Sequence, residues 1–378
     1  RYIFRKLGEI IGKEKIFQLE PNITKKAVAA LWAPTAGLVN PFEIVIALAE
    51  NAKQNGVDVF LNTEVIDIFK RDNSFTLKVS SGFSIVSKFV INAAGLFADK
   101  VASMVGADDF SISPYKGEEI IFDKKVGYLL NRPVFPPTPW VLVMPTVEGN
   151  IMAGTSYEQV ERKDDLATTF KSCRRILSNA KKLIPALSEK DIIRSFAGLR
   201  AMNTRTSDYI IESSNKIPEF INVVLGTPGI TSAPAVAKKV SQILANQGLK
   251  LVKKSNFNPY RQRISRFAES SDSEKMKMFS TDKLYGHVVC RCETVTEGEI
   301  VEAIKRGAKT LDGIKYRTRA GMGRCQGGFC SPRVVKILAR ELKIPVTEVT
   351  KKGDDSRILL FKSKELLEKE RKDEPSRS

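Results

Sequence analysis

The sequence predicts a mixed α/β and α+β fold over residues 1–250, followed by a small all-α domain. Three observations lead to this fold class. Short alternating strands and helical patterns follow one another through the first 250 residues. Hydrophobic residues make up 42% of the chain and charged residues 28%, which is typical of a globular protein. Four of the five cysteines fall between Cys290 and Cys330.

The N-terminal part begins with a helix predicted from Tyr2 to Ile11 and continues with a stronger helix over residues 42–55. Asn40 can cap this second helix, and Pro41 suits its first turn because the proline has no amide hydrogen to lose. Its apolar residues repeat at helical spacing and are predicted to be buried. They are Ile44, Val45, Leu48 and Ala52.

Two strand–turn–helix units are predicted further along the chain. Lys88–Ala93 is a nearly continuous apolar strand, as in a buried parallel sheet, and the small residues Ala94 and Gly95 follow it. A glycine-rich turn over residues 226–232 opens a helix predicted from Ala233 to Asn246. The free amides at such a helix start can hold an anionic or polar ligand.

Residues 111–200 are predicted as an inserted domain, with several strands and an amphipathic helix over Leu166–Lys182. The segment closes with F-A-G-L-R, which ends at Arg200. A fixed guanidinium can grip a phosphate or carboxylate with two hydrogen bonds. The alternative for Arg200 is a surface salt bridge.

The motif V-I-N-A-A-G-L-F-A-D, with P-T-A-G-L-V-N-P-F-E before it and P-Y-K-G-E-E-I-I-F-D after it, resembles the D-amino-acid-oxidase-like flavoprotein superfamily. The resemblance implies a partial FAD-binding Rossmann-like domain with an inserted antiparallel-sheet substrate domain. It places Arg200 beside the anionic group of the substrate. It also implies flavin contacts from Val65, Ala94, Gly95, Thr227, Gly229, Ile230 and Thr231.

The cysteines form two close pairs, C-x-C at Cys290 and Cys292 and C-x4-C at Cys325 and Cys330, with 32 residues between the pairs. Two such pairs can surround one metal centre with four thiolates, as in an iron–sulfur cluster. Gly321 and Gly323 would let the backbone turn tightly there, as would be needed beside a bound centre. A structural zinc site and a pair of disulfides are the alternatives.

Residues 288–342 resemble the bacterioferritin-associated-ferredoxin type of [2Fe-2S] domain through C-R-C-E, R-A-G-M-G-R-C-Q-G-G-F-C and the S-P helix start. They resemble more closely the version at the C-terminus of FAD-dependent glycerol-3-phosphate dehydrogenases. The resemblance implies a [2Fe-2S] cluster on Cys290, Cys292, Cys325 and Cys330.

The net charge is +18, and the basic excess is concentrated in the C-terminal third. Such charge would suit nucleic acid or an anionic membrane surface, but no nucleic-acid motif accompanies it, so no nucleic-acid partner is expected. We expect a solvated basic surface whose arginines also offset the negative charge of an iron–sulfur cluster bound by cysteines. The same surface could also dock an acidic redox partner. The compensating arginines would be Arg291, Arg317, Arg319 and Arg324.

The chain has one histidine, His287, which precedes the cysteine motif and is expected to be structural. A general base elsewhere must therefore be Asp, Glu, Lys or Tyr. No apolar run reaches the length of a membrane span, and no secretory signal is visible. A cytoplasmic location is predicted, with peripheral membrane association left open. Cys173 is expected to be a buried bystander.

The resembled superfamily begins with a βαβ unit whose G-x-G-x-x-G holds the ADP half of FAD, and no such motif follows a strand here. We therefore expect a fragment or split-gene product that binds FAD weakly or not at all by itself. The predicted boundaries divide the flavin-dependent region into a flavin side and a substrate side. The flavin side is 40–110 and 205–250, the substrate side 1–39 and 111–204, the linker 251–285, the [2Fe-2S] domain 286–345, and the charged tail 346–378.

Together the resemblances imply an FAD-dependent dehydrogenase that oxidises a small anionic alcohol and passes electrons through the cluster to a partner protein. The first candidate substrate is sn-glycerol 3-phosphate, which would become dihydroxyacetone phosphate. An L-2-hydroxyglutarate or amino-acid oxidoreductase of the same superfamily is an alternative, because a fold does not determine the substrate. A non-catalytic iron–sulfur electron-transfer or sensor subunit is another.

Overall fold

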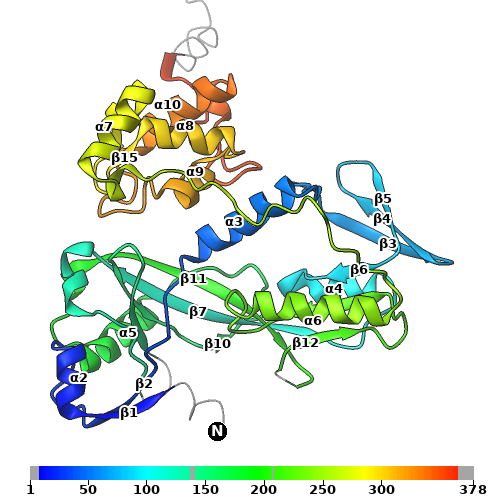
Figure 1. The fold of residues 1–378 in the computed structure, drawn as a ribbon, viewed down its shortest axis with the longest axis horizontal. Coiled ribbons are helices and arrows are strands. Elements are labelled where there is room, and N and C mark those ends of the chain that lie inside the picture. The colour runs from blue at the N-terminus through cyan, green and yellow to red at the C-terminus, as the bar shows by residue number, and fades with distance from the viewer. Residues whose placement is uncertain (1–7, 137–140, 207, 365–378) are drawn as a thin grey trace, which may run out of the picture. The chain divides into compact units, whose positions relative to one another are not determined.

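The computed structural model describes residues 8–136, 141–206 and 208–364 (Figure 1). The chain divides into two compact units. The first comprises Arg1–Val39 and Asn55–Phe257, and the second comprises Asn40–Gln54 and Asn258–Ser378. The segment Asn40–Gln54, which the sequence placed on the flavin side, thus groups with the cysteine-containing region.

The largest sheet of the first unit is antiparallel, in the order β10–β7–β9–β8 with β11 also paired to β7. Its strands are β7 (Ile112–Phe122), β8 (Leu142–Pro145), β9 (Ile151–Gly154), β10 (Glu158–Gln159) and β11 (Ile192–Asn203). Helix α5 (Phe170–Leu183) packs on one face, where Phe122 and Ile176 share an apolar core. Thr169 caps α5 by accepting a hydrogen bond from the Ser172 amide. The predicted antiparallel sheet is confirmed, and its helix begins at Phe170 instead of Leu166.

A second, three-stranded sheet has the order β12–β13–β6. Its strands are β6 (Val90–Asn92), β12 (Ile210–Ser213) and β13 (Phe220–Val224). As the apolar run predicted, β6 pairs in parallel, with β13. The buried side chains of Asn92 and Asn222 tie these strands together with a 2.9 Å hydrogen bond. Helix α6 (Ala233–Asn246) has the predicted bounds, and the turn η1 (Gly95–Phe97) leads from β6 into α4 (Ala98–Ser103).

A third sheet in this unit is a meander of β3 (Val65–Arg71), β4 (Ser74–Val79) and β5 (Ser84–Ser87). Ile68 and Phe75 from the meander share a core cluster with Phe220 of β13. The two aromatic rings lie 6.2 Å apart, which suits the tilted packing that aromatic pairs prefer. This cluster attaches the meander to the parallel strand pair.

The N-terminal segment corrects one prediction. Glu9–Gly12 is strand β1, because it pairs with β2 (Ala29–Trp32) in an antiparallel ladder, and α2 (Lys13–Leu19) follows. Residues 9–11 are therefore not the end of a helix, and the rest of that predicted helix, except Gly8, lies outside the described residues. The 3-10 turns η2 (Lys124–Leu129) and η3 (Glu189–Asp191) complete the unit.

The second unit is helical apart from one short ladder. It contains α3 (Pro41–Gln54), α7 (Asp272–Thr281), β14 (Val288–Cys290), β15 (Val295–Thr296), α8 (Glu297–Lys305), α9 (Leu311–Thr318) and α10 (Ser331–Leu342), with the 3-10 turns η4 (Phe267–Glu269), η5 (Lys283–Gly286) and η6 (Val346–Glu348). Ile300, Ile314 and Leu338 are fully buried in a common core. Thr296 and Glu299 form a capping box at α8. The small helical domain is confirmed, with β14 and β15 added to it.

Two features of this unit differ from the sequence analysis. Helix α3 has no buried residue, and Val45 and Leu48 are 52% and 57% exposed, because no described segment covers that apolar side. The burial predicted for that helix face is therefore wrong. Helix α7 lies inside the segment expected to be a linker and begins at a capping box formed by Ser271 and Glu274.

Within the described part of the chain, no helix combines the length and apolar character needed to cross a bilayer.

Candidate functional site

The fold rearranges the four cysteines into pairs that differ from the pairs in the sequence. Cys290 ends β14 and shares a side-chain hydrogen bond with Cys330, which immediately precedes α10. Cys292 lies 3.6 Å from Cys325, measured between the two sulfur atoms. Each structural pair thus takes one cysteine from C-x-C and one from C-x4-C.

The distance within the second pair fits a shared metal. Two thiolates bound to one tetrahedral metal at about 2.3 Å have sulfur atoms roughly 3.8 Å apart. Cys292 and Cys325 are close to that separation, and all five cysteines of the chain, which lie in the described ranges, are free thiols. The predicted disulfide alternative therefore does not apply to this structure.

The two thiol pairs match the ligand set of a [2Fe-2S] cluster, which takes two thiolates on each of two irons, whereas zinc takes four ligands around one point. Within the described residues, no group of three or more His, Cys, Asp and Glu side chains forms a site for a metal ion. Cys290 with Cys330 and Cys292 with Cys325 could hold one iron each.

Backbone amides donate to the sulfur atoms of Cys290 and Cys325 and favour the thiolate form of these two residues. The hydrogen bond from Cys330 lowers the pKa of Cys290 to about 6, and the amides of Gly321 and Glu293 also donate to that sulfur. A hydrogen bond from the Phe329 amide lowers the pKa of Cys325. Amide donors of this kind stabilise negative sulfur and influence the potential of a cluster.

Glycines allow the two cysteine loops to approach each other. A Cβ atom at Gly323 would overlap the Cβ of Cys292 and lie 3.0 Å from a Glu293 oxygen. Gly327 has φ +92°, where an L side chain would be strained. Of the two glycines expected to matter, Gly323 makes the close approach, while Gly321 has φ +91°.

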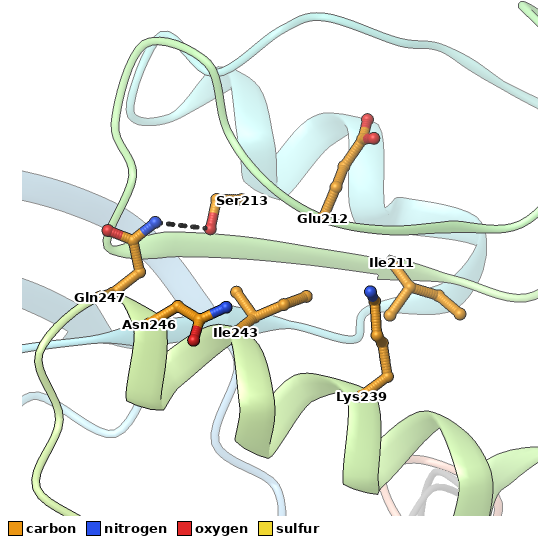
Figure 2. A pocket seen from close by; sticks show the side chains of 7 residues that line it. All are labelled: Ile211, Glu212, Ser213, Lys239, Ile243, Asn246 and Gln247. Atoms are coloured by element: carbon orange, nitrogen blue, oxygen red, sulfur yellow. Dashed lines mark hydrogen bonds between the residues drawn. The ribbon is translucent and has the colours of Figure 1, made fainter.

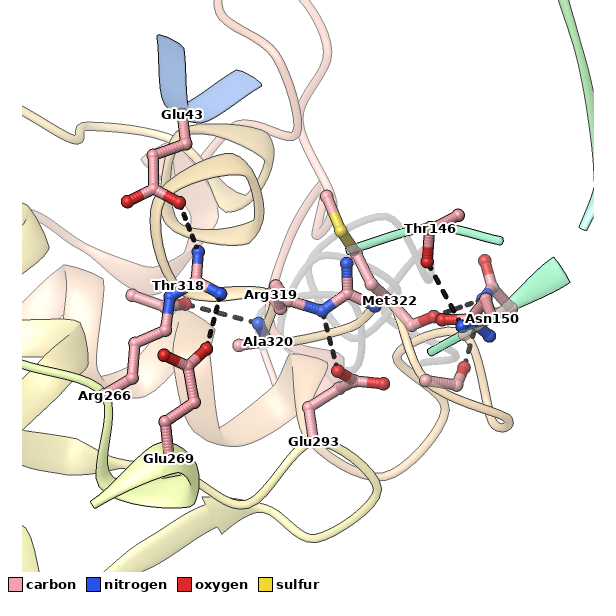
Figure 3. A network of polar contacts seen from close by, with 12 residues as sticks. Glu43, Thr146, Asn150, Arg266, Glu269, Glu293, Thr318, Arg319, Ala320 and Met322 are labelled. Carbon is pink, nitrogen blue, oxygen red and sulfur yellow. Dashed lines mark hydrogen bonds and ion pairs between the residues drawn. The ribbon is translucent and has the colours of Figure 1, made fainter. Parts of the chain in front are cut away.

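An ion pair connects the same loops. Arg319 Nε donates to Glu293 Oε2 at 2.7 Å, and the two side chains are only 13% and 3% exposed (Figure 3). Glu293 follows Cys292 directly, and Arg319 ends α9 in the left-handed conformation. The pair therefore holds the C-x-C loop against the segment that leads to Cys325.

The four arginines predicted to offset cluster charge have different surroundings. Arg319 is already paired with Glu293. Arg317 donates to the Gly313 carbonyl, and burial lowers its pKa. Arg291 and Arg324 are exposed beside the cysteines.

His287 is held by a carboxylate, as a structural residue would be. Its Nδ1 lies 2.5 Å from Glu297 Oε2, and Arg340 lies 2.6 Å from the other oxygen of Glu297. Burial would raise the pKa of Glu297, but the bonds to His287 and Arg340 outweigh it and lower the pKa. This triad connects the residue before β14 with the start of one helix and the end of another, since Glu297 begins α8 and Arg340 lies in the last turn of α10.

In the first unit, most of the predicted flavin-contacting residues lie at one sheet edge. Ala94 and Gly95 follow β6, and the turn 227–231 follows the neighbouring parallel strand β13. Because parallel strands end at the same edge, the two turns are neighbours at the carboxyl ends, where open α/β sheets bind ligands. Val65 is separate, since it begins β3 in the meander.

Arg200 lies on the open face of the antiparallel sheet. Its Nη2 donates to Thr155 Oγ1 at 3.0 Å, and the guanidinium carbon is 5.5 Å from the ring centre of Tyr157. A Cβ at Gly117 would lie 2.6 Å from both Nη atoms, so the guanidinium lies directly across that glycine. Nη1 is buried and finds no hydrogen-bond partner among the described residues.

A buried donor without a partner costs on the order of 1–3 kcal/mol, and more when the group is charged. An anionic oxygen placed at Nη1 of Arg200 would remove that cost. Thr155 accepts a hydrogen bond from Nη2 of Arg200, and Glu119 is the carboxylate whose charge acts on the guanidinium. The arrangement can bind a phosphate or carboxylate.

Sequence reasoning missed Glu119, which shares this face. Successive residues of a strand point to opposite faces of the sheet. Along β7, Glu118 and Ile120 are buried, whereas Glu119 between them is only partly buried and points to the opposite face. A Cβ at Gly154 would lie 2.5 Å from Glu119 Cγ. Burial raises the pKa of Glu119, although the charge of Arg200 opposes that rise. Strand alternation in K-G-E-E was the signal that could have identified it.

A surface pocket of the first unit lies between β12 and α6 (Figure 2). Ile211 and Ile243 line it, and Gln247 donates to Ser213 Oγ at 3.3 Å at one end. None of the residues predicted to bind flavin or substrate lines it. We assign no ligand to this pocket.

An antiparallel sheet, a parallel strand pair that ends in two turns, and four thiols on two loops are the features expected of an iron–sulfur flavoprotein oxidoreductase. The chain belongs to the FAD dependent oxidoreductase family, whose model matches residues 3–243. Residues 288–340 match the BFD-like [2Fe-2S] binding domain. The cofactors expected from the sequence, FAD and a [2Fe-2S] cluster, are those of the two matched families.

Three relatives illustrate the similarity. A glycerol 3-phosphate dehydrogenase of Caloramator mitchellensis is 45% identical over 93% of this chain and 74% of its own length. Subunit A1 of an anaerobic glycerol-3-phosphate dehydrogenase from Haloferax volcanii is 24% identical over 88% of this chain and 64% of its own length. The reduced L-alpha-glycerophosphate oxidase of Mycoplasma pneumoniae with FAD bound has a TM-score of 0.60 and 28% identity, with 67% of each chain covered.

Proposed function

We propose that this chain belongs to an FAD-dependent dehydrogenase that oxidises sn-glycerol 3-phosphate to dihydroxyacetone phosphate. The observation that carries the proposal is the buried, unpartnered Nη1 of Arg200 on the open face of the sheet. The 45% identity to a glycerol 3-phosphate dehydrogenase supports this substrate over 2-hydroxyglutarate or an amino acid. When bound, FAD supplies the two-electron oxidant, and the cluster supplies a one-electron relay.

Arg200 positions the phosphate of the substrate. Thr155 and Tyr157 hold the guanidinium in place, and Gly117 leaves the space in which it lies. A guanidinium fixed in this way loses little freedom when it binds a phosphate with two hydrogen bonds. The substrate is thereby oriented with its alcohol group on the open face of the sheet.

Glu119 accepts the proton of the alcohol. The oxygen–hydrogen bond of the alcohol would break toward the Glu119 carboxylate, and a bound FAD would supply the oxidant that takes up the hydride of the carbinol C–H bond. A raised pKa makes a carboxylate a stronger base near neutral pH. Glu119 shares this sheet face with Arg200, whose charge acts on the carboxylate.

Cys290, Cys292, Cys325 and Cys330 would hold the [2Fe-2S] cluster, which would supply a one-electron relay to a partner protein. Relatives named as subunits of anaerobic glycerol-3-phosphate dehydrogenases support a multi-subunit assembly. Flavin contacts by Ala94, Gly95 and the turn at 227–231 are part of the proposal, as is the adenine-side contact by Val65. The cytoplasmic location, the domain boundaries and weak FAD binding by the chain alone stay predictions.

Calorimetric titration of the chain with sn-glycerol 3-phosphate and with L-2-hydroxyglutarate, each with FAD present, tests the substrate. We expect tighter binding of the phosphate, and Arg200→Lys should weaken it about 10- to 100-fold, because a charged hydrogen bond contributes roughly 1.5–3 kcal/mol. Arg205→Lys, at an exposed arginine paired with Glu212, is the matched control. Equal affinity for both ligands, or no effect of Arg200→Lys, would contradict the proposal.

A further inference from the structure

Gly198 lies in the middle of β11, on the same face of the sheet as Arg200, because residues two apart in a strand point to one face. Apart from its two chain neighbours, no heavy atom of the described residues lies within 4 Å of the place where its Cβ would be. Its φ is not in the left-handed region that favours glycine. An alanine would therefore fit at this position without strain.

The fold explains the glycine opposite Gly198 but not Gly198 itself. Gly117 pairs directly with Gly198, and a Cβ at Gly117 would lie 2.6 Å from both Nη atoms of Arg200. Glycine weakens the interior of a strand, because it loses more freedom on folding and has no side chain to pack. A strand glycine that no neighbour requires often marks a place where a ligand approaches the backbone closely.

The residues that flank Gly198 limit the length of such a ligand. Along β11, Gly198 lies between Phe196 and Arg200, which share its face, and Phe196 pairs in register with Glu119. Arg200 therefore borders the bare backbone on one side, and Phe196 and Glu119 border it on the other. Phe196 and Arg200 are four residues apart, or about 13 Å between Cα atoms, so the space between their side chains suits a short molecule.

We propose that Gly198 is a specificity-determining residue, whose bare backbone lies under the carbon chain of a short anionic alcohol. The inference rests on the proposed function, since it takes the anion at Arg200 and the hydroxyl at Glu119 as the two ends of the substrate. The carbon chain crosses between them over Gly198 and contacts its Cα and peptide group. A Cβ at this position would take the space of one methylene and lift the chain away from the sheet.

Calorimetric titration of the full chain with FAD present tests this role, with sn-glycerol 3-phosphate and inorganic phosphate as the two probes. Gly198→Ala should weaken binding of sn-glycerol 3-phosphate about 10- to 200-fold, which is the effect of one methylene in a fitted pocket, and Gly198→Val should weaken it further. Inorganic phosphate should bind both variants unchanged, because it has no carbon chain and contacts only the guanidinium. Arg200→Lys should weaken the binding of both probes.

Thermal unfolding separates a lost substrate contact from a damaged fold. Gly198→Ala should keep or raise the melting temperature, because alanine suits the interior of a strand better than glycine does. The matched control is Gly12→Ala, which adds the same methyl group at an exposed glycine of β1. A Cβ at Gly12 would also have no neighbour within 4 Å among the described residues. This control should leave the affinities for both probes unchanged.

The outcomes separate this inference from the proposed function. If the unchanged chain does not bind sn-glycerol 3-phosphate, or binds it independently of Arg200, both fail. If the chain binds it through Arg200 but Gly198→Ala binds it equally well, only the role of Gly198 is overturned. An equal loss of inorganic phosphate binding in Gly198→Ala, or a lower melting temperature, would overturn that role too, since the glycine would then serve the anion site or the fold.

Discussion

Replacing Glu293 with alanine should destabilise the cysteine-containing unit strongly. The carboxylate lies 2.7 Å from Arg319 Nε, and the two side chains are 3% and 13% exposed. Glu293→Ala would leave a buried guanidinium without this carboxylate, and breaking a buried ion pair in this way costs about 3–5 kcal/mol. It would also release the C-x-C loop from the segment that leads to Cys325.

Urea unfolding followed by the visible circular dichroism of the cluster measures this loss. The control is Glu341→Gln, which removes one of the two carboxylates paired with Arg340, in a pair whose side chains are 53% and 29% exposed. Such a pair contributes about 1 kcal/mol or less. If Glu293→Ala and Glu341→Gln lowered the free energy of unfolding equally, the assignment of the buried ion pair as the connection between the loops would be refuted.

Three further changes test other parts of the structure. Glu119→Gln should reduce kcat/KM for sn-glycerol 3-phosphate about 100-fold or more. It should also remove the acidic limb from the pH profile of kcat/KM. In the unchanged protein that limb should lie above pH 4.5, because the pKa of Glu119 is raised and its base form is lost as pH falls through it. Gly323→Ala should abolish iron retention, since its Cβ overlaps Cys292. Cys292→Ser should halve or abolish the visible absorbance, whereas Cys173→Ser, outside both loops, should retain all of it.

The elements that could be predicted from the sequence are those with strong local signals. The turn before Ala233 and the capping box at Thr296 mark α6 and α8, and both helices begin where predicted. Helix α7 was missed because its sequence is mostly polar, so its apolar residues do not repeat along one face. Local signals therefore identify helix starts better than they identify weakly amphipathic helices.

Features that depend on tertiary contacts could not be predicted. The spacing of the cysteines indicates that Cys290 and Cys292 are close, but only the fold shows that each pairs with a cysteine from the other loop. Glu119 follows another glutamate and gains its role from Arg200, which lies 81 positions later on the adjacent strand. The helical pattern of α3 indicates an apolar side but not whether another segment covers it.

Iron and acid-labile sulfide analysis, combined with electron paramagnetic resonance of the dithionite-reduced chain, tests the central claim most directly. The two thiol pairs predict about two irons and two sulfides per chain and one paramagnetic signal from a reduced [2Fe-2S] cluster. Adding sn-glycerol 3-phosphate and FAD should not be needed for that signal. A colourless chain with bound zinc and no such signal would contradict the account.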